Sequence, residues 1–225
     1  MADAAPGPQR PKLRVAVLIS GGGSNMAALL GAAAAADFPA EIALVLSNRA
    51  DAGGLAKAAA AGVATAVVDH RAFPDRDSFD AAIDAELARH GIEFVCLAGF
   101  MRLLTEGFTD RWRDRMINVH PSLLPLFKGL HTHQRALDAG VRFHGCTVHF
   151  VRFGMDEGPI IVQAAVPVLA GDDADSLAAR VLAMEHKIYP LALRLVGEGR
   201  AVVDGERVRI EGEGAAPGGM LWPAG

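Results

Sequence analysis

Short apolar runs alternate with longer helix-like stretches through the first two-thirds of this chain, and no other feature constrains the fold as strongly. Strands are expected near 14–19, 42–47, 63–68, 93–98 and 116–119, and helices near 25–36, 53–61, 76–90 and 105–113. The apolar runs lack polar alternation, which is typical of strands buried on both faces. The pattern predicts an α/β fold with a mostly parallel, doubly wound sheet.

The pattern changes after residue 140. The runs GCTVHFV and PIIVQAAVPV, joined by the turn-forming RFGMDEG, predict antiparallel strands. A long helix is expected from about 174 to 196, where DDADSL supplies capping groups and Gly197 a stop signal. A short hairpin is expected around DGER. The length of 225 residues fits one domain.

Charge and cysteine content exclude several classes of protein. The 22 Lys and Arg residues against 26 Asp and Glu give a net charge of -4, so no nucleic-acid partner is expected. Cys96 and Cys146 stand in apolar runs without C-x-x-C spacing, which predicts buried, reduced thiols. The run VAVLIS is too short to span a membrane and lacks a following A-x-A-like cleavage site. We therefore expect a cytoplasmic protein without membrane attachment.

A glycine-rich segment, SGGGSN at 20–25, stands between the first expected strand and the first expected helix. Its glycines let backbone N–H groups approach an anion, Ser24 and Asn25 add donors, and the helix dipole favours negative charge. The segment fits a phosphate site and, equally, a tight turn without a ligand. Met26 replaces the third glycine of G-x-G-x-x-G and G-x-x-x-x-G-K-[ST] is absent, so neither NAD nor ATP is expected.

The segment INVHPSLLP at 117–125 carries the second group of candidates. Asn118 and His120 are two residues apart, so they project to one face at the carboxyl end of a strand, where ligands of open α/β sheets bind. An amide beside an imidazole suits acyl transfer, because both can stabilise an oxyanion. Asp156 is the carboxylate best placed to keep such a His charged and oriented. The structural alternatives are a buried, backbone-bonded His and a turn-forming Asp.

The histidines raise the question of a metal site. His131 and His133 stand two residues apart, and His120, His144 and His149 are also available. Without a clear third ligand this spacing is weak evidence for zinc, so we expect no metal. Residues 128–133 are expected to lie beside the active site.

Five motifs occur here in the order found in glycinamide ribonucleotide formyltransferases. They are S-G-x-G-S-N at 20–25, A-G-F-M-R at 98–102, N-x-H-P-S-L-L-P at 118–125, G-L-H-T-H at 129–133 and M-D-x-G-P at 155–159. The chain resembles that family from about residue 13 to about 200, with Gly22 and Leu126 as departures. The resemblance implies a single-domain formyltransferase fold at 13–212 between tails at 1–12 and 213–225. It also implies a phosphate-binding half at 13–115 and a catalytic and folate half at 116–212.

The resemblance further implies transfer of a formyl group from 10-formyltetrahydrofolate to the amine of glycinamide ribonucleotide, by direct attack of the amine. The implied catalytic residues are Asn118, His120 and Asp156. Ribonucleotide binding is implied for Gly23, Ser24, Asn25 and Glu185. Folate binding is expected for Arg76, Met101, Arg102, Leu103, Leu104, Asn118, Arg152, Phe153, Gly154, Met155 and Asp156, of which Leu103 and Leu104 also suit core packing.

Other functions remain open at this point. A formyltetrahydrofolate hydrolase and a methionyl-tRNA formyltransferase share the Asn, His and Asp pattern, but each normally carries a further domain for which this chain leaves no room. A silent nucleotide-binding module on the same fold is the non-enzymatic alternative. The expected partners are small-molecule substrates only, with no metal, ATP or NAD. A monomer or a homodimer is expected.

Overall fold

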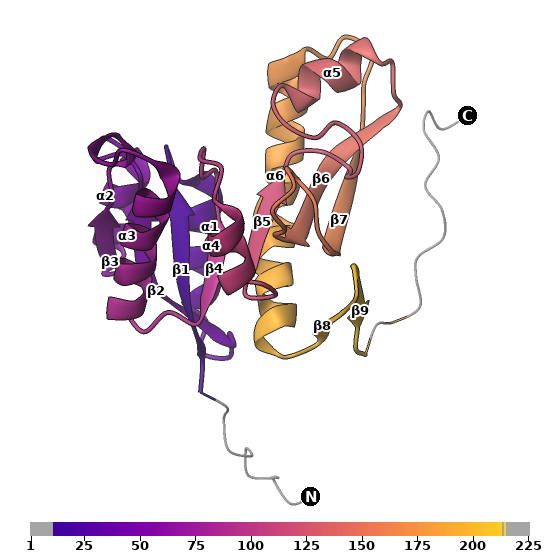
Figure 1. Ribbon diagram of the computed structural model, residues 1–225. Coiled ribbons are helices and arrows are strands. Elements are labelled where there is room, and N and C mark those ends of the chain that lie inside the picture. Colours follow the sequence, from indigo (N-terminus) through magenta and orange to yellow (C-terminus); the bar gives the residue numbers. More distant parts are fainter. Residues whose placement is uncertain (1–10, 213, 215–225) are drawn as a thin grey trace, which may run out of the picture.

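The computed structural model describes residues 11–212 and residue 214, and its centre is one seven-stranded sheet. Its strands are β1 (Leu13–Ile19), β2 (Ala40–Ser47), β3 (Ala64–Val67), β4 (Phe94–Leu97), β5 (Met116–His120), β6 (Phe143–Phe150) and β7 (Ile160–Pro167). Their order across the sheet is β3-β2-β1-β4-β5-β6-β7 (Figure 1). Strands β1 to β5 are parallel, whereas β6 and β7 pair antiparallel. The predicted fold class is confirmed.

The helices also follow the prediction, with one exception. They are α1 (Ser24–Ala33), α2 (Gly53–Ala60), α3 (Arg76–Arg89), α4 (Glu106–Arg111), α5 (Thr132–Asp138) and α6 (Ala174–Gly197), with a 3-10 turn η1 (His70–Ala72). A hairpin of β8 (Ala201–Asp204) and β9 (Arg207–Ile210) follows α6. Helix α5 was not predicted, because it is short and begins after His131 without a side-chain cap. None of the helices in the described part of the chain is long and apolar enough to cross a membrane.

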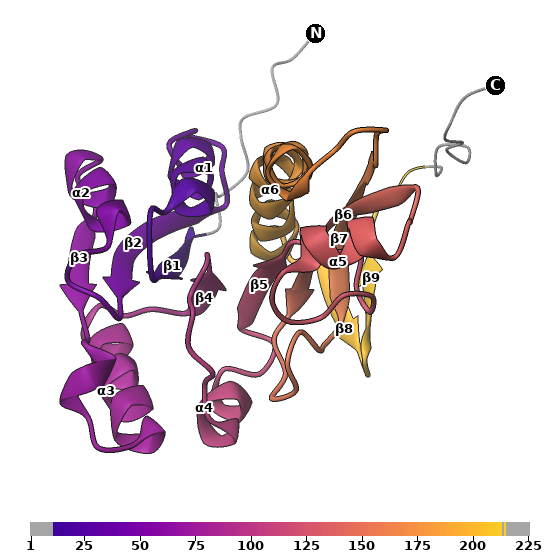
Figure 2. The same ribbon diagram turned by 90° about the horizontal axis from the view of Figure 1, so that it is seen from above.

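The two faces of the sheet bury separate apolar clusters, and alternate residues of β1 feed them. Val15, Val17 and Ile19 pack with residues of α1, α2 and α6. Ala16 and Leu18 pack on the other face with residues of α3 and α4. Figure 2 shows the same division, with α1, α2 and α6 on one side of the sheet and α3 and α4 on the other. Burial on both faces explains why these strands read as unbroken apolar runs.

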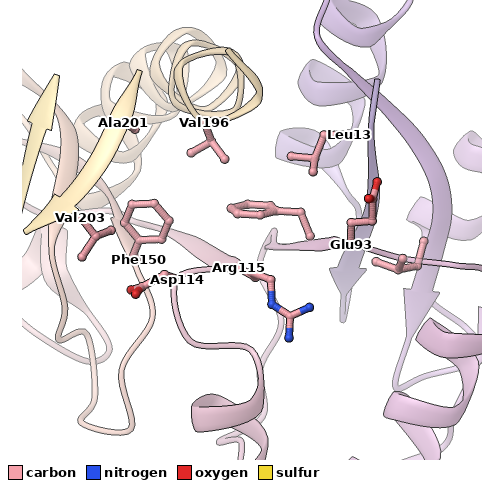
Figure 3. A pocket seen from close by; sticks show the side chains of 10 residues that line it. Leu13, Glu93, Asp114, Arg115, Phe150, Val196, Ala201 and Val203 are labelled. Carbon is pink, nitrogen blue, oxygen red and sulfur yellow. The ribbon is translucent and has the colours of Figure 1, made fainter. Parts of the chain in front are cut away.

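A cavity of about 560 Å³ lies at the amino ends of the parallel strands, between the sheet and β8 (Figure 3). Its apolar wall includes Leu13, Phe94 and Val203, and the ring of Phe150 faces the cavity. None of the predicted site residues lines it, and the predicted catalytic residues lie at the opposite edge of the sheet.

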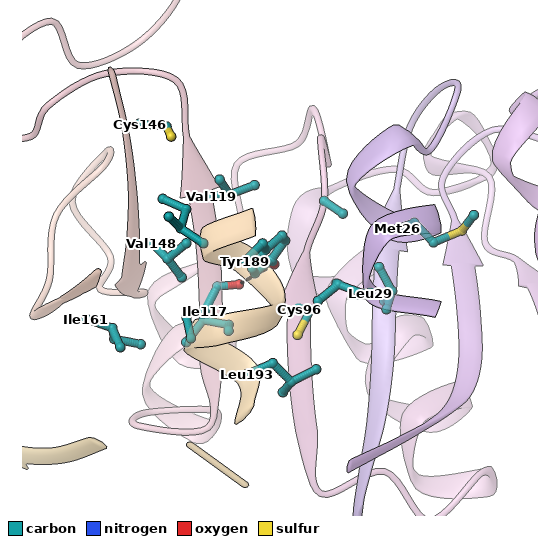
Figure 4. Packing of buried hydrophobic residues seen from close by; sticks show 14 of the residues in the cluster. Met26, Leu29, Cys96, Ile117, Val119, Cys146, Val148, Ile161, Tyr189 and Leu193 are labelled. Carbon is teal, nitrogen blue, oxygen red and sulfur yellow. Dashed lines mark hydrogen bonds between the residues drawn. The ribbon is translucent and has the colours of Figure 1, made fainter. Parts of the chain in front are cut away.

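Helix α6 connects the core to that opposite edge. Its first turn is closed by a capping box, in which the Asp173 carboxylate accepts from the Ser176 N–H and the Ser176 hydroxyl accepts from the Asp173 N–H. Further along, the fully buried Tyr189 hydroxyl donates to the carbonyl oxygen of Leu97 at 2.9 Å and lies 3.3 Å from that of Ile117 (Figure 4). The helix therefore contacts β4 and β5 just before the residues of the site.

The two cysteines lie in this core. Cys96 and Cys146 are both free and buried. Burial raises the pKa of both thiols, that of Cys146 to about 12, so both remain protonated near neutral pH. The prediction of buried, reduced thiols is confirmed.

Candidate active site

The site forms at the point where the order of the parallel strands reverses, between β1 and β4. Strand β1 lies between β2 and β4, so the segments that follow β1 and β4 diverge and leave a crevice at the carboxyl edge of the sheet. Ser20 connects the loops around this crevice. Its N–H donates to Gly99 O at 3.2 Å, its Oγ accepts from Met101 N at 2.8 Å, and its hydroxyl donates to Asn48 Oδ1 at 2.6 Å. Sequence reasoning assigned no role to Asn48, whose contribution depends on this tertiary contact.

The glycine-rich segment lines a cavity of about 430 Å³ in this crevice. Gly23 has a left-handed backbone (φ 67°) and occupies the cap position of α1, so no side chain covers the first N–H groups of the helix. Ser24, Asn25 and Arg49 also line the cavity. The arrangement leaves backbone donors at the amino end of α1 available to an anion.

A larger cavity of about 880 Å³ adjoins the glycine-lined cavity. The two share Asn25, Gly99, Met101 and Arg102. Its lining comes from segments far apart in the chain: Asn25, residues 99–103, 118–121 and 129–133, Met155, Asp156 and Glu185. All three predicted catalytic residues are among them. Residues 129–133 lie beside the site, as predicted.

His120 and Asp156 contact each other in the wall of this cavity. Their Nδ1 and Oδ1 atoms are 3.2 Å apart, and both side chains are largely buried. On the other side of the ring, Nε2 lies 3.1 Å from the carbonyl oxygen of Phe127. Both ring nitrogens therefore face oxygen acceptors, and only a doubly protonated imidazole can donate to both. The two contacts fix the orientation of the His120 ring.

Asp156 is held in place by its backbone and by a second contact. Its φ of 51° is left-handed, which is uncommon for a residue other than glycine and often marks functional positions. Its Oδ2 accepts from the N–H of Gly129 at 2.7 Å. The carboxylate thus connects the turn at 152–158 to the loop that precedes α5, and directs its other oxygen at His120.

Asn118 is oriented by His149, a residue for which no catalytic role was predicted. The Nδ1 of His149 lies 2.9 Å from Phe150 O and therefore carries a proton. Burial lowers the pKa of His149, so the ring is neutral and its Nε2 accepts from Asn118 Nδ2 at 3.3 Å. The amide of Asn118 keeps a second N–H for a ligand. The spacing of Asn118 and His149 in the sequence gives no sign of this pair, because the contact arises from the β5–β6 register.

Glu185 connects α6 to the glycine-rich segment. Its Oε2 accepts from Asn25 Nδ2 at 2.6 Å, and its side chain is buried. Burial raises the pKa of Glu185, while the bond from Asn25 opposes that shift. Two predicted ribonucleotide-binding residues, distant in the chain, are therefore in direct contact.

Several predicted folate residues lie outside the cavity. Arg152 pairs instead with Asp114 at 2.8 Å and with Glu206 at 3.4 Å. Arg76, Phe153 and Gly154 are likewise absent from the lining, although Met101, Arg102, Leu103 and Met155 belong to it. Leu104 is buried in the core beside α3 and α4, which is the alternative stated for it above.

Two of the other histidines, His133 and His144, pack against each other. The rings of His133 and His144 meet edge to face with centroids 5.3 Å apart. Within the described residues, no group of three or more His, Cys, Asp or Glu side chains is placed to hold a metal ion.

Comparison with known proteins agrees with this geometry. A family model described as formyl transferase matches residues 13–193. The phosphoribosylglycinamide formyltransferase of Escherichia coli (strain K12) is 42% identical over 210 residues, which cover 90% of this chain and 99% of that protein. The chain belongs to the phosphoribosylglycinamide formyltransferases.

Solved structures of phosphoribosylglycinamide formyltransferases share the fold. Glycinamide ribonucleotide transformylase 1 from Symbiobacterium toebii matches with a TM-score of 0.86 and 51% identity over 88% of this chain and 94% of that one. The formyltransferase from Brucella melitensis matches with a TM-score of 0.80 and 55% identity over 86% and 100%. The trifunctional purine biosynthetic protein adenosine-3 of Bos taurus is 50% identical over 202 residues, and the chain spans only 20% of that protein.

Proposed function

We propose that this chain transfers the formyl group of 10-formyltetrahydrofolate to the amine of glycinamide ribonucleotide, a step of de novo purine synthesis. The observation that carries the proposal is the meeting of Asn118, His120 and Asp156 around one cavity, with Nδ1 of His120 3.2 Å from Asp156. The names of the relatives support the same reaction.

In the proposed mechanism the amine nitrogen attacks the formyl carbon directly, and the bond from that carbon to N10 of the folate then breaks. Asn118 and His120 donate to the formyl oxygen as it gains negative charge. Removing one such donor typically costs about a hundredfold to a thousandfold in rate. The amine loses one proton and N10 gains one, so no net proton is consumed.

Asp156 acts through His120 in this mechanism. The carboxylate stabilises the charged imidazole and fixes the ring, so that its N–H can serve the formyl oxygen. Nε2 of His120 lies 3.1 Å from Phe127 O. The formyl oxygen of the bound folate would share or replace this contact.

The two adjoining cavities suit the two substrates. The glycine-rich segment with Ser24 offers N–H donors for the phosphate of the ribonucleotide, and Asn25 and Glu185 stand between that segment and the catalytic residues. For the folate, Met101, Leu103 and Met155 supply exposed apolar surface at the rim of the larger cavity, as a flat heterocycle requires.

Four expectations from the sequence remain predictions. They are a cytoplasmic location, a monomer or homodimer as the assembly, the absence of ATP and NAD, and the absence of a metal. None of them enters the mechanism above.

The direct test uses purified protein with both substrates. The wild type is expected to form the formylated ribonucleotide, and His120→Ala is expected to lose about a hundredfold to ten-thousandfold in kcat. Calorimetric titration should show that His120→Ala still binds the ribonucleotide, because His120 lies outside the glycine-lined cavity. Unchanged turnover in His120→Ala would falsify the mechanism.

His90→Ala is a matched control, since His90 ends α3 and lines neither cavity of the site. Release of formate without ribonucleotide, at a rate matching transfer, would instead identify a formyltetrahydrofolate hydrolase.

Asp156→Asn is expected to lower kcat/KM and to change its dependence on pH.

A further inference from the structure

A mostly buried arginine lies at the start of the Asp156 turn (residues 152–158). Arg152 follows β6, and its side chain is only 11% exposed. Its Nη2 donates to Asp114 Oδ1 at 2.8 Å, and its Nε lies 3.4 Å from the Glu206 carboxylate. Its Nη1 donates to the carbonyl oxygen of the preceding residue at 3.2 Å. Each of the three guanidinium nitrogens therefore faces an acceptor of the protein.

The two carboxylates come from different parts of the chain. Asp114 precedes β5, whereas Glu206 lies in the turn between β8 and β9. Asp114 and strand β8 also border the cavity at the amino ends of the parallel strands (Figure 3). Among the described residues of the hairpin, 201–210, none lines either cavity of the site. Through Arg152, the hairpin is nevertheless connected to the Asp156 turn.

The backbone of the turn closes on Arg152. Its N–H donates to Glu157 O at 3.2 Å, and the N–H of Glu157 donates to Gly154 O at 3.2 Å. A Cβ on Gly158 would lie 2.1 Å from Phe150 O and 3.1 Å from Arg152 Cγ, so glycine is required there. The turn is therefore folded directly against the stem of the Arg152 side chain.

We propose that Arg152 is a positioning residue, which fixes the Asp156 turn so that its carboxylate stays in contact with His120. The contact at stake is the 3.2 Å approach of Asp156 Oδ1 to His120 Nδ1. Gly129 holds the other oxygen of this carboxylate, and Arg152 holds the beginning of the turn. This inference rests on the proposed function, because it takes His120 and Asp156 as parts of the reaction.

The partners of Arg152 can be solvated when the arginine is removed. The Asp114 side chain is 43% exposed and that of Glu206 62%, so water reaches both carboxylates. Loss of the arginine therefore leaves no buried charge without a partner, which is the main reason that broken ion pairs unfold proteins. Arg152→Met keeps the apolar stem that packs on Gly158 and removes only the charge and the donors. The variant should displace the turn without unfolding the protein.

The experiment measures the kinetics of Arg152→Met and Arg152→Lys with both substrates. Arg152→Met is expected to lower kcat roughly tenfold, because a displaced carboxylate no longer fixes the imidazole. The calorimetric Kd for the ribonucleotide should stay unchanged, since Arg152 lies outside the glycine-lined cavity. Arg152→Lys keeps the charge without the planar fork, so its kcat should lie between those of Arg152→Met and the wild type.

A double-mutant cycle tests whether the effect passes through Asp156. In an Asp156→Asn background, Arg152→Met should lower kcat less than about twofold, because the carboxylate that Arg152 positions is gone. If Arg152→Met does not fold, Asp114→Asn takes its place in the cycle. This substitution removes the negative charge that lies 2.8 Å from the guanidinium group, and it is expected to lower kcat severalfold.

Arg113→Met is the matched control. Arg113 also pairs with Glu206, at 3.2 Å, but none of its hydrogen bonds in the described part of the chain reaches the Asp156 turn. The substitution should leave kcat and both KM values unchanged. Thermal unfolding of all variants reports any loss of structure.

The outcomes separate the two proposals. A wild type without formyl transfer would refute the proposed function, and the role of Arg152 with it. If the wild type is active, an unchanged kcat in Arg152→Met would refute the role of Arg152 alone. A loss of equal size in the Asp156→Asn background, or in Arg152→Lys, would refute it as well. A raised KM for 10-formyltetrahydrofolate with an unchanged kcat would also refute it, and would show that Arg152 binds the folate, as the sequence predicted.

Discussion

At the scale of single residues, two neighbouring glycines of the glycine-rich segment differ in whether alanine can replace them. Gly22 has no positive φ, and an added Cβ would meet nothing within 4 Å. Gly23 has a φ of 67°, and its Cβ would lie 3.0 Å from Gly54 Cα. Gly22→Ala is therefore expected to stabilise the protein by about 0.4–1 kcal/mol through the unfolded chain. Gly23→Ala is expected to destabilise it by more than about 1 kcal/mol.

Urea unfolding of the two variants measures both effects. The comparison is matched, because both substitutions add one methyl group to adjacent positions of the same segment. Equal stability changes in the two variants would show that the left-handed conformation of Gly23 does not restrict this segment.

His149 provides a second residue-scale prediction. Its neutral ring accepts from the amide of Asn118, so His149→Ala should let that amide rotate and lower kcat by roughly tenfold or more. A double-mutant cycle with Asn118→Ala tests the coupling. Because His149 acts through Asn118, its substitution should cost little once Asn118 is alanine. Fully additive losses would contradict this arrangement.

At the scale of secondary-structure elements, α6 is coupled to two strands by one hydroxyl. Tyr189→Phe removes the hydroxyl's hydrogen bond to Leu97 O inside the core, which should cost about 0.5–1.5 kcal/mol of unfolding free energy. Denaturant titration measures this loss, and the m-value should not change. An unchanged unfolding free energy in Tyr189→Phe would mean that this hydrogen bond contributes nothing net to stability.

How closely a helix could be predicted depends on the capping residues and the apolar face that its own sequence carries. Helix α6 was predicted closely because Asp173 and Ser176 cap it and an apolar face continues along it. Helix α5 was missed because His131 enters it in a left-handed conformation without a capping side chain. Local signals therefore suffice for α6, whose caps and apolar face are both local, and they fail for α5, which is short and has no capping side chain.

At the scale of the whole molecule, buried histidines make stability depend on pH. Burial is the main cause that lowers the pKa of His144 from 6.5 to about 4, with the neighbouring His133 adding to the effect. Below pH 6.5 the unfolded chain binds a proton at this imidazole that the folded protein does not accept until about pH 4. The unfolding free energy should therefore fall across this window, by at most about 3 kcal/mol from His144.

The measurement is the unfolding free energy of wild type and His144→Gln at several pH values between 7 and 4. The variant should show a shallower slope, while His133 and His149, whose pKa values are also lowered by burial, account for a remainder. Glu185 acts in the opposite direction, because its raised pKa favours the folded protein at low pH. An identical slope in His144→Gln would exclude His144 as a source.

The sequence by itself determined the layered α/β architecture and pointed to Asn118, His120 and Asp156. Apolar periodicity and turn residues are local properties, and the catalytic motifs are contiguous. Only the tertiary structure decided that Arg152 pairs with Asp114 instead of lining the cavity, and that His149 orients Asn118. Partners of this kind are set by strand register and loop packing, which bring together side chains whose separation along the chain carries no information about their contact.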